Sequence, residues 1–116
     1  MVVVGTRPNL MKVTRFREVA ARRGDAKIVL VHTGQHSDER MSKVFLTQFG
    51  LRPDHWLDVP QGGPVERLAR IMLALEPLVK AGRPDAMVVV GDVDSTLAAA
   101  LVANKMAVPL VHLESG

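Results

Sequence analysis

Short apolar runs alternate with segments of helical periodicity along the whole chain. This alternation is typical of a parallel sheet whose strands are joined by crossover helices. The strong runs are apolar throughout, as expected when helices cover both faces of a sheet, so we expect the sheet to be buried. The predicted strands are residues 1–4, 26–32, a weak 55–59, 86–90 and 109–113.

Four apolar stripes with helical spacing connect these strands. Their members are Leu10, Val13, Phe16, Val19 and Ala20; then Met41, Val44, Phe45, Leu46 and Phe49; then Val65, Leu68, Ala69, Met72 and Leu75; and finally Leu97, Leu101 and Val102. Gly24 is the predicted stop of the first helix. Pro77 should kink or end the third, because proline lacks the amide donor of the helical ladder. Asp94 or Ser95 can cap the fourth, which should run to about Met106.

The fold class predicted from this pattern is α/β, a doubly wound, Rossmann-like parallel sheet. A chain of 116 residues, 47% of them apolar, can form the core of one such domain. The absence of cysteine removes disulfides, thiolate metal sites and thiol nucleophiles, and favours a reducing, cytoplasmic setting. Met1 precedes an apolar triplet rather than a basic segment, and no stretch approaches the roughly 18 apolar residues of a membrane span. We therefore expect neither membrane insertion nor export.

The net charge of +3 is unevenly distributed, since ten of the fifteen Lys and Arg residues lie at or before Arg52. A basic half of this kind suggests an anionic partner. Aromatic residues make up only 3% of the chain, and Phe16, Phe45 and Phe49 occupy core positions of helical stripes. Stacking platforms for bases are therefore missing, so a phosphorylated small molecule fits better than nucleic acid.

Polar segments follow four of the predicted strands, at residues 5–9, 33–36, 91–95 and 114–116. Ligands of open α/β sheets bind beyond the carboxyl ends of the strands, so functional residues are expected in these segments. In the commonest doubly wound order the first strand lies beside the fourth. The segments that carry Arg7 and Asp92 should then face each other, with Glu114 at the end of the next strand along.

Together these segments resemble the UDP-N-acetylglucosamine 2-epimerase family, of the non-hydrolysing type. The residues that carry the resemblance are Gly5-Thr6-Arg7-Pro8 with Lys12, Thr33-Gly34-Gln35-His36, Gly91-Asp92 with Ser95-Thr96, and His112-Leu113-Glu114-Ser115-Gly116. Their order and spacing match over nearly the whole chain. Asn9, Asp94 and Ser115 depart from commoner family residues, but none of these departures removes a residue assigned to chemistry.

The resemblance implies a two-domain enzyme of the B-type glycosyltransferase architecture that needs no cofactor. It would interconvert UDP-N-acetylglucosamine and UDP-N-acetylmannosamine in polysaccharide biosynthesis. Residues 1–116 would be its incomplete amino-terminal domain, and a second, UDP-binding domain would be absent from this chain. The chain by itself should therefore be inactive, whereas the full-length protein should be a homodimer.

Arg7 and Lys12 flank the expected start of the first helix, where free backbone N–H groups and the helix dipole favour an anion. The segment is neither a Walker loop nor a dinucleotide fingerprint, and a solvated helix start is the alternative. The resemblance assigns both side chains to the substrate, where they would contact the diphosphate.

Asp92 and Glu114 are the candidate catalytic residues, and the resemblance also assigns them to substrate binding. The alternatives are a helix cap for Asp92, a role that Asp94 or Ser95 fits better, and a surface position for Glu114. In the family reaction, departure of UDP builds positive charge on the sugar ring and makes the C2 hydrogen acidic enough for a carboxylate. Asp92 and Glu114 could stabilise this charge and share the acid and base roles, before UDP adds back to a glycal-like intermediate.

Gln35 and His36 match the family's segment for a second, regulatory nucleotide-sugar site, and Arg70 on the third helix is a further candidate for it. Loop structure and an exposed helix face are the alternatives. His32 and His55 have no partners in sequence and are expected to be satisfied or exposed histidines. No cluster of His and carboxylate residues has metal-ligand spacing, so no metal is expected.

Three other functions remain open from the sequence. The protein could be a hydrolysing epimerase, in which water captures the intermediate, a nucleotide-sugar glycosyltransferase of the same fold, or a non-catalytic binding fragment. Fold alone does not separate these functions. The combined Gly-Thr-Arg-Pro, Gly-Asp and His-x-Glu motifs favour epimerisation over glycosyl transfer.

Overall fold

The computed structural model describes residues 1–5, 18–20, 22–24, 26–34, 53–60, 62–90 and 94–113. Short helical stretches occur in this part of the chain at 18–20 and 22–23. The longer elements, in chain order, are β1 (Val2–Val4), β2 (Leu30–His32), β3 (His55–Trp56), α3 (Pro64–Gly82), β4 (Met87–Val90), α4 (Asp94–Lys105) and β5 (Leu110–Leu113). Each matches a predicted element in type and order.

The strands form one parallel sheet in the order β3-β2-β1-β4-β5. Val3 in β1 is paired with Val31 on one side and with Val89 on the other. The first strand thus lies beside the fourth, as predicted, and β5 follows β4. Because all strands are parallel, their carboxyl ends lie along one edge of the sheet.

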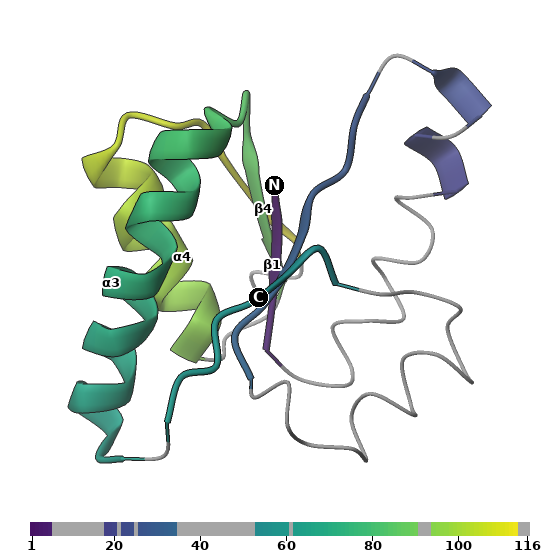
Figure 1. Cartoon of the computed structure of the whole chain (residues 1–116). Coiled ribbons are helices and arrows are strands. Elements are labelled where there is room, and N and C mark those ends of the chain that lie inside the picture. The colour runs from purple at the N-terminus through teal and green to yellow at the C-terminus, as the bar shows by residue number, and fades with distance from the viewer. Residues whose placement is uncertain are drawn as a thin grey trace.

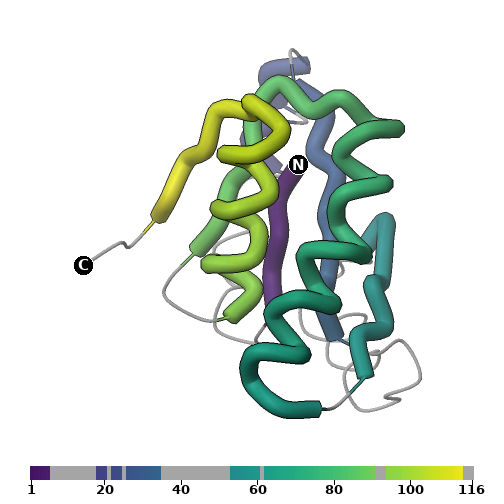
Figure 2. Tube along the Cα trace, turned by 90° about the vertical axis from the view of Figure 1, so that its left-hand side faces the viewer, coloured from purple at the N-terminus to yellow at the C-terminus, as the bar shows by residue number. Residues whose placement is uncertain are grey.

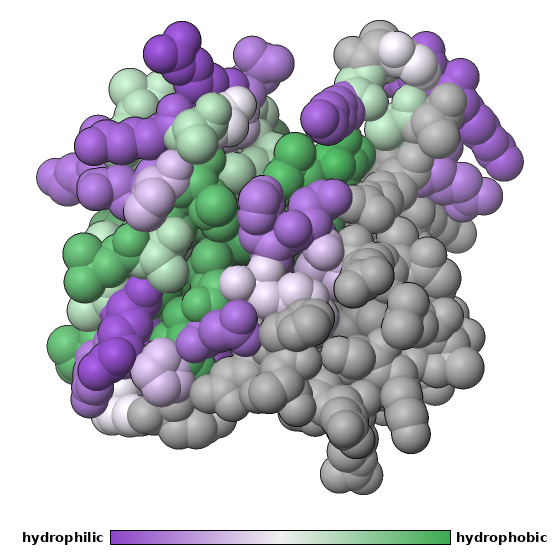
Figure 3. Space-filling view, viewed as in Figure 1, coloured by the Kyte–Doolittle hydropathy of each residue, from purple (hydrophilic) through white to green (hydrophobic). Residues whose placement is uncertain are grey.

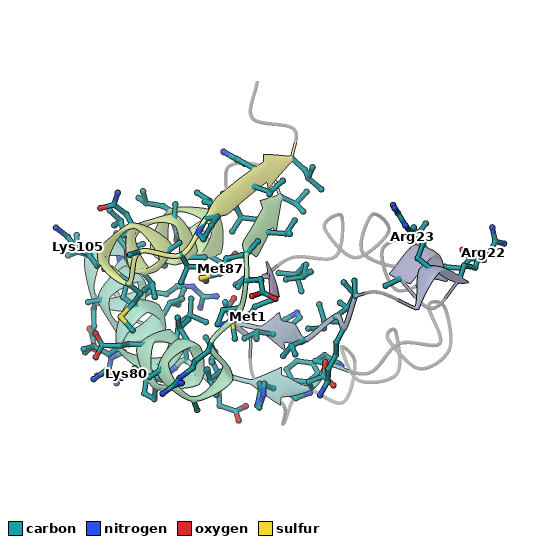
Figure 4. The ribbon with its side chains drawn as sticks, turned by 90° about the horizontal axis from the view of Figure 1, so that it is seen from above. Met1, Arg22, Arg23, Lys80, Met87 and Lys105 are labelled. Carbon is teal, nitrogen blue, oxygen red and sulfur yellow. The ribbon has the colours of Figure 1, made fainter. Side chains whose placement is uncertain are left out.

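Helices lie on both sides of this sheet (Figure 1). Two of them, α3 and α4, cover one face, and the helical residues 18–20 and 22–23 lie on the other side (Figure 4). The two long helices lie side by side and run in the same direction (Figure 2), because each connects parallel strands. The doubly wound fold class is therefore confirmed.

The core lies on both faces of the sheet, because successive side chains of a strand point to opposite faces. Beneath the long helices, the larger cluster consists of Val3, Val31, Leu75, Val79, Met87, Val89, Ala99, Val102 and Ala103, and a smaller one of Val59, Ile71 and Ala98. The cluster on the other face consists of Val2, Val4 and Leu30. Since both faces are filled, β1 and β4 are apolar at every position, which is the continuous pattern seen in the sequence.

Two strands differ from the prediction. β2 begins at Leu30 rather than at residue 26, because Leu30 is opposite Val2, the first residue of β1. The other strand is β5, where Leu110 is 39% and Val111 45% exposed. In the described residues β5 pairs with β4 alone, and the expected burial of the whole sheet is wrong at this edge.

Pro77 was expected to kink or end α3; it does not end the helix, which continues to Gly82. Proline removes one amide donor, whose acceptor would be the carbonyl of Leu73. Both residues are on the exposed side of the helix, where water can satisfy that carbonyl. On the inner side Leu75 and Val79 are buried, and their packing on the sheet stabilises the helix across the proline.

Five residues of the predicted apolar stripes are exposed instead. Val65 and Ala69 lie on the outer face of α3, Val19 is 50% exposed, and Leu97 and Leu101 of α4 are 52% and 37% exposed. Gly24 is confirmed as a helix stop, since its N–H donates to the Ala20 carbonyl at 2.9 Å and its φ is +69°. The stripe at residues 41–50 lies outside the described residues, as do Leu10, Val13 and Phe16.

Candidate functional site

The predicted site residues lie mostly outside the described part of the chain. Those outside it are Arg7, Lys12, Gln35, His36, Asp92 and Glu114, whereas Arg70 lies within it. Each of the outside residues except Lys12 nevertheless follows within three residues of a described strand end or strand-end loop. These neighbours determine where each segment leaves the sheet.

The segments that carry Asp92 and Glu114 start next to each other. Val90 and Leu113 are the last residues of their strands, and they are paired in the parallel register of β4 and β5. Neighbouring strands are separated by about 4.8 Å, so the two segments leave the sheet at about this spacing. The strand ends that precede Asp92 and Glu114 therefore lie side by side, and the placement of the two carboxylates stays a prediction.

Gly5, at the end of β1, brings two further segments into contact. A Cβ atom at this position would lie 2.8 Å from Thr33 Oγ1 and would collide with Ser95 Oγ. Thr33 comes directly after β2, and Ser95 lies in the first turn of α4. Only glycine leaves room for this approach, so the ends of β1 and β2 and the start of α4 meet at one place.

Thr33 and Ser95, the two residues that approach Gly5, are both polar and buried. Thr33 has no exposed surface, and its Oγ1 has no hydrogen-bond partner among the described residues. Ser95 is 4% exposed, so it lies inside the first helical turn rather than as a solvent-facing cap. Buried hydroxyls are normally hydrogen-bonded, so Thr33 Oγ1 is an exception to the usual pairing of buried polar groups.

Thr96 links the start of α4 to the end of β4. Its Oγ1 donates a buried hydrogen bond of 2.9 Å to the carbonyl of Val90. This bond joins the first turn of α4 to the last residue of β4. The described residues on either side of residues 91–93 are thereby held together.

His32 stabilises the turn that follows β2. Its ring is buried, its Nδ1 accepts a 2.8 Å hydrogen bond from the Gly34 N–H, and it lies 4.6 Å from the Trp56 ring. Burial lowers the pKa of His32 to about 4, so the ring is neutral at neutral pH. Both histidines were expected to be satisfied or exposed; His55 is exposed, and His32 is hydrogen-bonded through Nδ1. The role of His32 in shaping the turn before Gln35 was missed, although the His-x-Gly spacing is a signal for it.

Arg70 lies on the outer side of α3. Its Nη2 is 2.7 Å and its Nε 2.9 Å from Glu66 Oε1, one helical turn earlier. Both side chains are about half exposed. Participation of Arg70 in a regulatory site stays a prediction.

Other kinds of site are not found in the described part of the chain. Its residues contain no group of three His, Cys, Asp or Glu that could hold a metal ion, and its helices are too short or too polar to cross a membrane. A hollow of about 620 Å³ lies at the opposite edge of the sheet, lined in part by Met1, Ile28 and Asp85. It lies at the amino ends of the strands, opposite the edge at which the strands end.

The fold defines the class of protein: an α/β domain of Rossmann type, a class whose ligands generally bind beyond the carboxyl ends of the strands. A family model described as UDP-N-acetylglucosamine 2-epimerase matches residues 18–116. The chain belongs to the UDP-N-acetylglucosamine 2-epimerase family. The resemblance seen in the sequence motifs is thereby confirmed.

Characterised relatives agree with this assignment. The UDP-2,3-diacetamido-2,3-dideoxy-D-glucuronate 2-epimerase of Pseudomonas aeruginosa is 34% identical, over 100% of this chain and 33% of that protein. The UDP-N-acetylglucosamine 2-epimerase of Methanococcus maripaludis is 32% identical, over 99% of this chain and 31% of that protein. Among solved structures, this chain is similar to the crystal structure of the Methanocaldococcus jannaschii UDP-GlcNAc 2-epimerase in complex with UDP-GlcNAc and UDP. The TM-score is 0.87 at 31% identity, and the match covers 99% of this chain and 32% of that protein. The chain thus spans about a third of the length of these relatives.

Proposed function

We propose that the full-length protein carrying this chain interconverts UDP-N-acetylglucosamine and UDP-N-acetylmannosamine by elimination and re-addition of UDP. The observation that carries the proposal is the family match over residues 18–116. Relatives named for this activity, about 30% identical over the whole chain, support it. The non-hydrolysing outcome is part of the proposal, and release of the free sugar is its alternative.

In this proposal Arg7 and Lys12 bind the diphosphate, and Asp92 and Glu114 act at C2 of the sugar. The convergence of Gly5, Thr33 and Ser95 at the sheet edge supports a common site for these segments. The paired ends of β4 and β5 support the proximity of the two carboxylates. Gln35, His36 and Arg70 are proposed for a separate regulatory site.

The remaining two thirds of the relatives' length would supply a second, UDP-binding domain. The chain alone would then be inactive, because the substrate would lie between two domains of which it has one. A cytoplasmic location is part of the same proposal and is supported by the absence of cysteine. The proposal also includes a homodimeric full-length enzyme.

A second substrate is favoured by a specific observation. The relative at 34% identity is named for UDP-2,3-diacetamido-2,3-dideoxy-D-glucuronate, which is also a UDP-linked 2-acetamido sugar. The chemistry at C2 would be the same, and the substituents at C3 and C6 would differ. Residues of this chain near C2 would thus serve either substrate.

The test is product analysis with both UDP sugars and the purified full-length protein. The proposal predicts the C2 epimer of UDP-N-acetylglucosamine at equilibrium, without accumulation of UDP and free sugar. Conversion of the diacetamido glucuronate alone would support the second candidate. Release of free N-acetylmannosamine would indicate a hydrolysing enzyme, and no conversion of either UDP sugar would contradict the proposed function.

A further inference from the structure

The backbone at the end of β2 is held from both neighbouring segments. On the β1 side, the Thr33 N–H donates a hydrogen bond of 3.0 Å to the carbonyl at the end of that strand. On the β3 side, the N–H groups of Leu57 and Asp58 donate to the carbonyls of His32 and Gly34, at 2.9 and 3.1 Å. The one further donor in this stretch is the Gly34 N–H, which points to a side chain rather than to another strand.

The side chain of His32 supplies the acceptor for that donor. Its Nδ1 accepts the Gly34 N–H at 2.8 Å, two residues further along the chain. Asn and Asp close the same kind of turn when their side chains bond to the backbone two residues on. The ring is buried and lies 4.6 Å from the Trp56 ring, and burial lowers its pKa to about 4. The imidazole is therefore neutral at neutral pH, and a lone pair on Nδ1 is free to accept.

The residues around this hydrogen bond are adapted to one backbone geometry. A Cβ atom at Gly34 would lie 2.7 Å from His32 Cε1 and 2.9 Å from Nδ1, so only glycine lets the ring approach this closely. Asp58 donates to the Gly34 carbonyl from a φ of 53°, in the left-handed region that few non-glycine residues adopt. Such a conformation persists only where the surrounding structure holds it, and it is found most often near ligand sites.

The segment after Gly34 begins with Gln35 and His36, the two residues proposed for a regulatory site. A glycine without a fixed partner samples many backbone conformations, and a ligand that needs one of them has to order the chain when it binds. The bond from Gly34 to His32 restricts this freedom before any ligand arrives. The affinity for a ligand of Gln35 and His36 should therefore depend on a side chain that does not touch it.

We propose that His32 is a positioning residue of the nucleotide-sugar site to which Gln35 and His36 belong. Its Nδ1 holds Gly34 in one conformation, and the two following side chains are thereby presented together to a nucleoside diphosphate sugar. The inference rests on the proposed function for the assignment of Gln35 and His36. It does not require that the bound nucleotide sugar is turned over.

Two substitutions separate the acceptor from the bulk of the ring. His32→Asn keeps an acceptor at the same number of bonds from the backbone, but it loses the ring contact with Trp56. His32→Leu is apolar and fills much of the same space, but it cannot accept the Gly34 N–H. A merely structural role predicts that affinity follows the melting temperature of the two variants, whereas the positioning role predicts that it follows the acceptor.

The measurement is equilibrium dialysis of the full-length protein with UDP-N-acetylglucosamine labelled in the uridine, which reports binding with or without turnover. Gln35→Ala identifies the binding that belongs to this segment. His32→Leu should weaken the same binding about 10-fold, whereas His32→Asn should stay within about 3-fold of wild type. His55→Leu, at the exposed histidine of β3, is the matched control and should bind as wild type.

A combination of variants tests whether His32 acts through the two following residues. In a protein that carries both Gln35→Ala and His36→Ala, His32→Leu should cause no further loss, because the side chains that it positions are gone. A full 10-fold loss in that background would overturn the inference, as would wild-type binding by His32→Leu or equal losses in the leucine and asparagine variants. Unchanged binding after Gln35→Ala with His36→Ala would also overturn it, since there would be no site to position. Epimerase assays on the same samples keep the two proposals apart: binding with the predicted pattern but without epimerisation contradicts the proposed function alone.

Discussion

At the residue scale, Gly5 controls how closely three segments of the candidate site approach one another. Gly5→Ala adds a methyl group that would collide with Ser95 Oγ and would lie 2.8 Å from Oγ1 of the fully buried Thr33. We expect a loss of about 1 to 3 kcal/mol in the free energy of unfolding, as for other overpacked sites, together with lower epimerase activity. Urea unfolding of the full-length variant measures the first effect. Gly63→Ala is the matched control, since nothing lies within 4 Å of its Cβ position, and a control that loses as much stability would contradict this explanation.

His32 should make stability depend on pH. Its pKa is lowered to about 4 by burial, against 6.5 in the unfolded chain, so the unfolded state alone takes up a proton between these values. The contribution of His32 is thus constant above about pH 6.5, and stability falls as the pH drops from there to about 4, by at most about 3 kcal/mol. Urea midpoints across this range should show the loss, and His32→Gln should make the free energy of unfolding depend less steeply on pH. An unchanged pH dependence in that variant would assign the loss to other groups. His55→Gln, at an exposed histidine, is the control.

The proposed division of labour between the charged residues is testable by kinetics. Asp92→Asn and Glu114→Gln keep shape but remove charge and proton-accepting ability, so each should lower kcat by about 100-fold to 10,000-fold. Arg7→Ala should mainly raise KM, because a diphosphate contact is made equally in the ground and transition states. Steady-state assays of the full-length enzyme distinguish these effects. A near-normal kcat in either carboxylate variant would remove that residue from the catalytic set.

At the scale of elements, the connection between β4 and α4 depends on Thr96. Thr96→Val keeps the side-chain volume but removes the donor to the Val90 carbonyl, which should cost about 1 kcal/mol. Residues 91–93 lie between these anchors, so turnover should fall with stability. Thr96→Ser retains the hydroxyl and should preserve both. Equal unfolding free energies for the valine variant and the wild-type protein would show that this bond does not stabilise the connection.

The elements also show what the sequence can and cannot predict. The continuous apolar runs of β1 and β4 predict buried strands correctly, because both faces of the sheet are covered. Two apolar stripes run along α3, however, one through Ile71 and Leu75 and the other through Val65 and Leu73. Periodicity alone does not say which stripe faces the sheet, and the outer one was assigned to the core in part.

The candidate site could also be predicted only in part from the sequence. The strand order and the polar loops at the carboxyl ends follow from general rules of α/β sheets, so the meeting of the loops could be predicted. The contact of Gly5 with Thr33 and Ser95 could not, since it depends on side-chain distances across three separate segments. The hydrogen bond from Gly34 to His32 is similar, because it depends on which ring nitrogen faces the turn.

At the scale of the whole molecule, two surfaces of the described residues are apolar and exposed. One is the β5 edge with Leu110 and Val111, and the other is the outer side of α3 and α4. Figure 3 shows hydrophobic surface among hydrophilic side chains on the side that the helices occupy. The relatives are about three times as long as this chain, and in a protein of that length the β5 edge is where further sequence can extend the sheet.

The central claim is that this chain carries part of the C2 chemistry of a UDP-sugar epimerase. It is tested most directly by incubating the full-length protein with UDP-N-acetylglucosamine in D₂O and following C2 by NMR. Proton removal and return should place deuterium at C2 of the epimerised sugar and of recovered substrate, and Asp92→Asn and Glu114→Gln should abolish both exchange and turnover. Epimer formed without deuterium at C2, or undiminished exchange in both carboxylate variants, would contradict the claim.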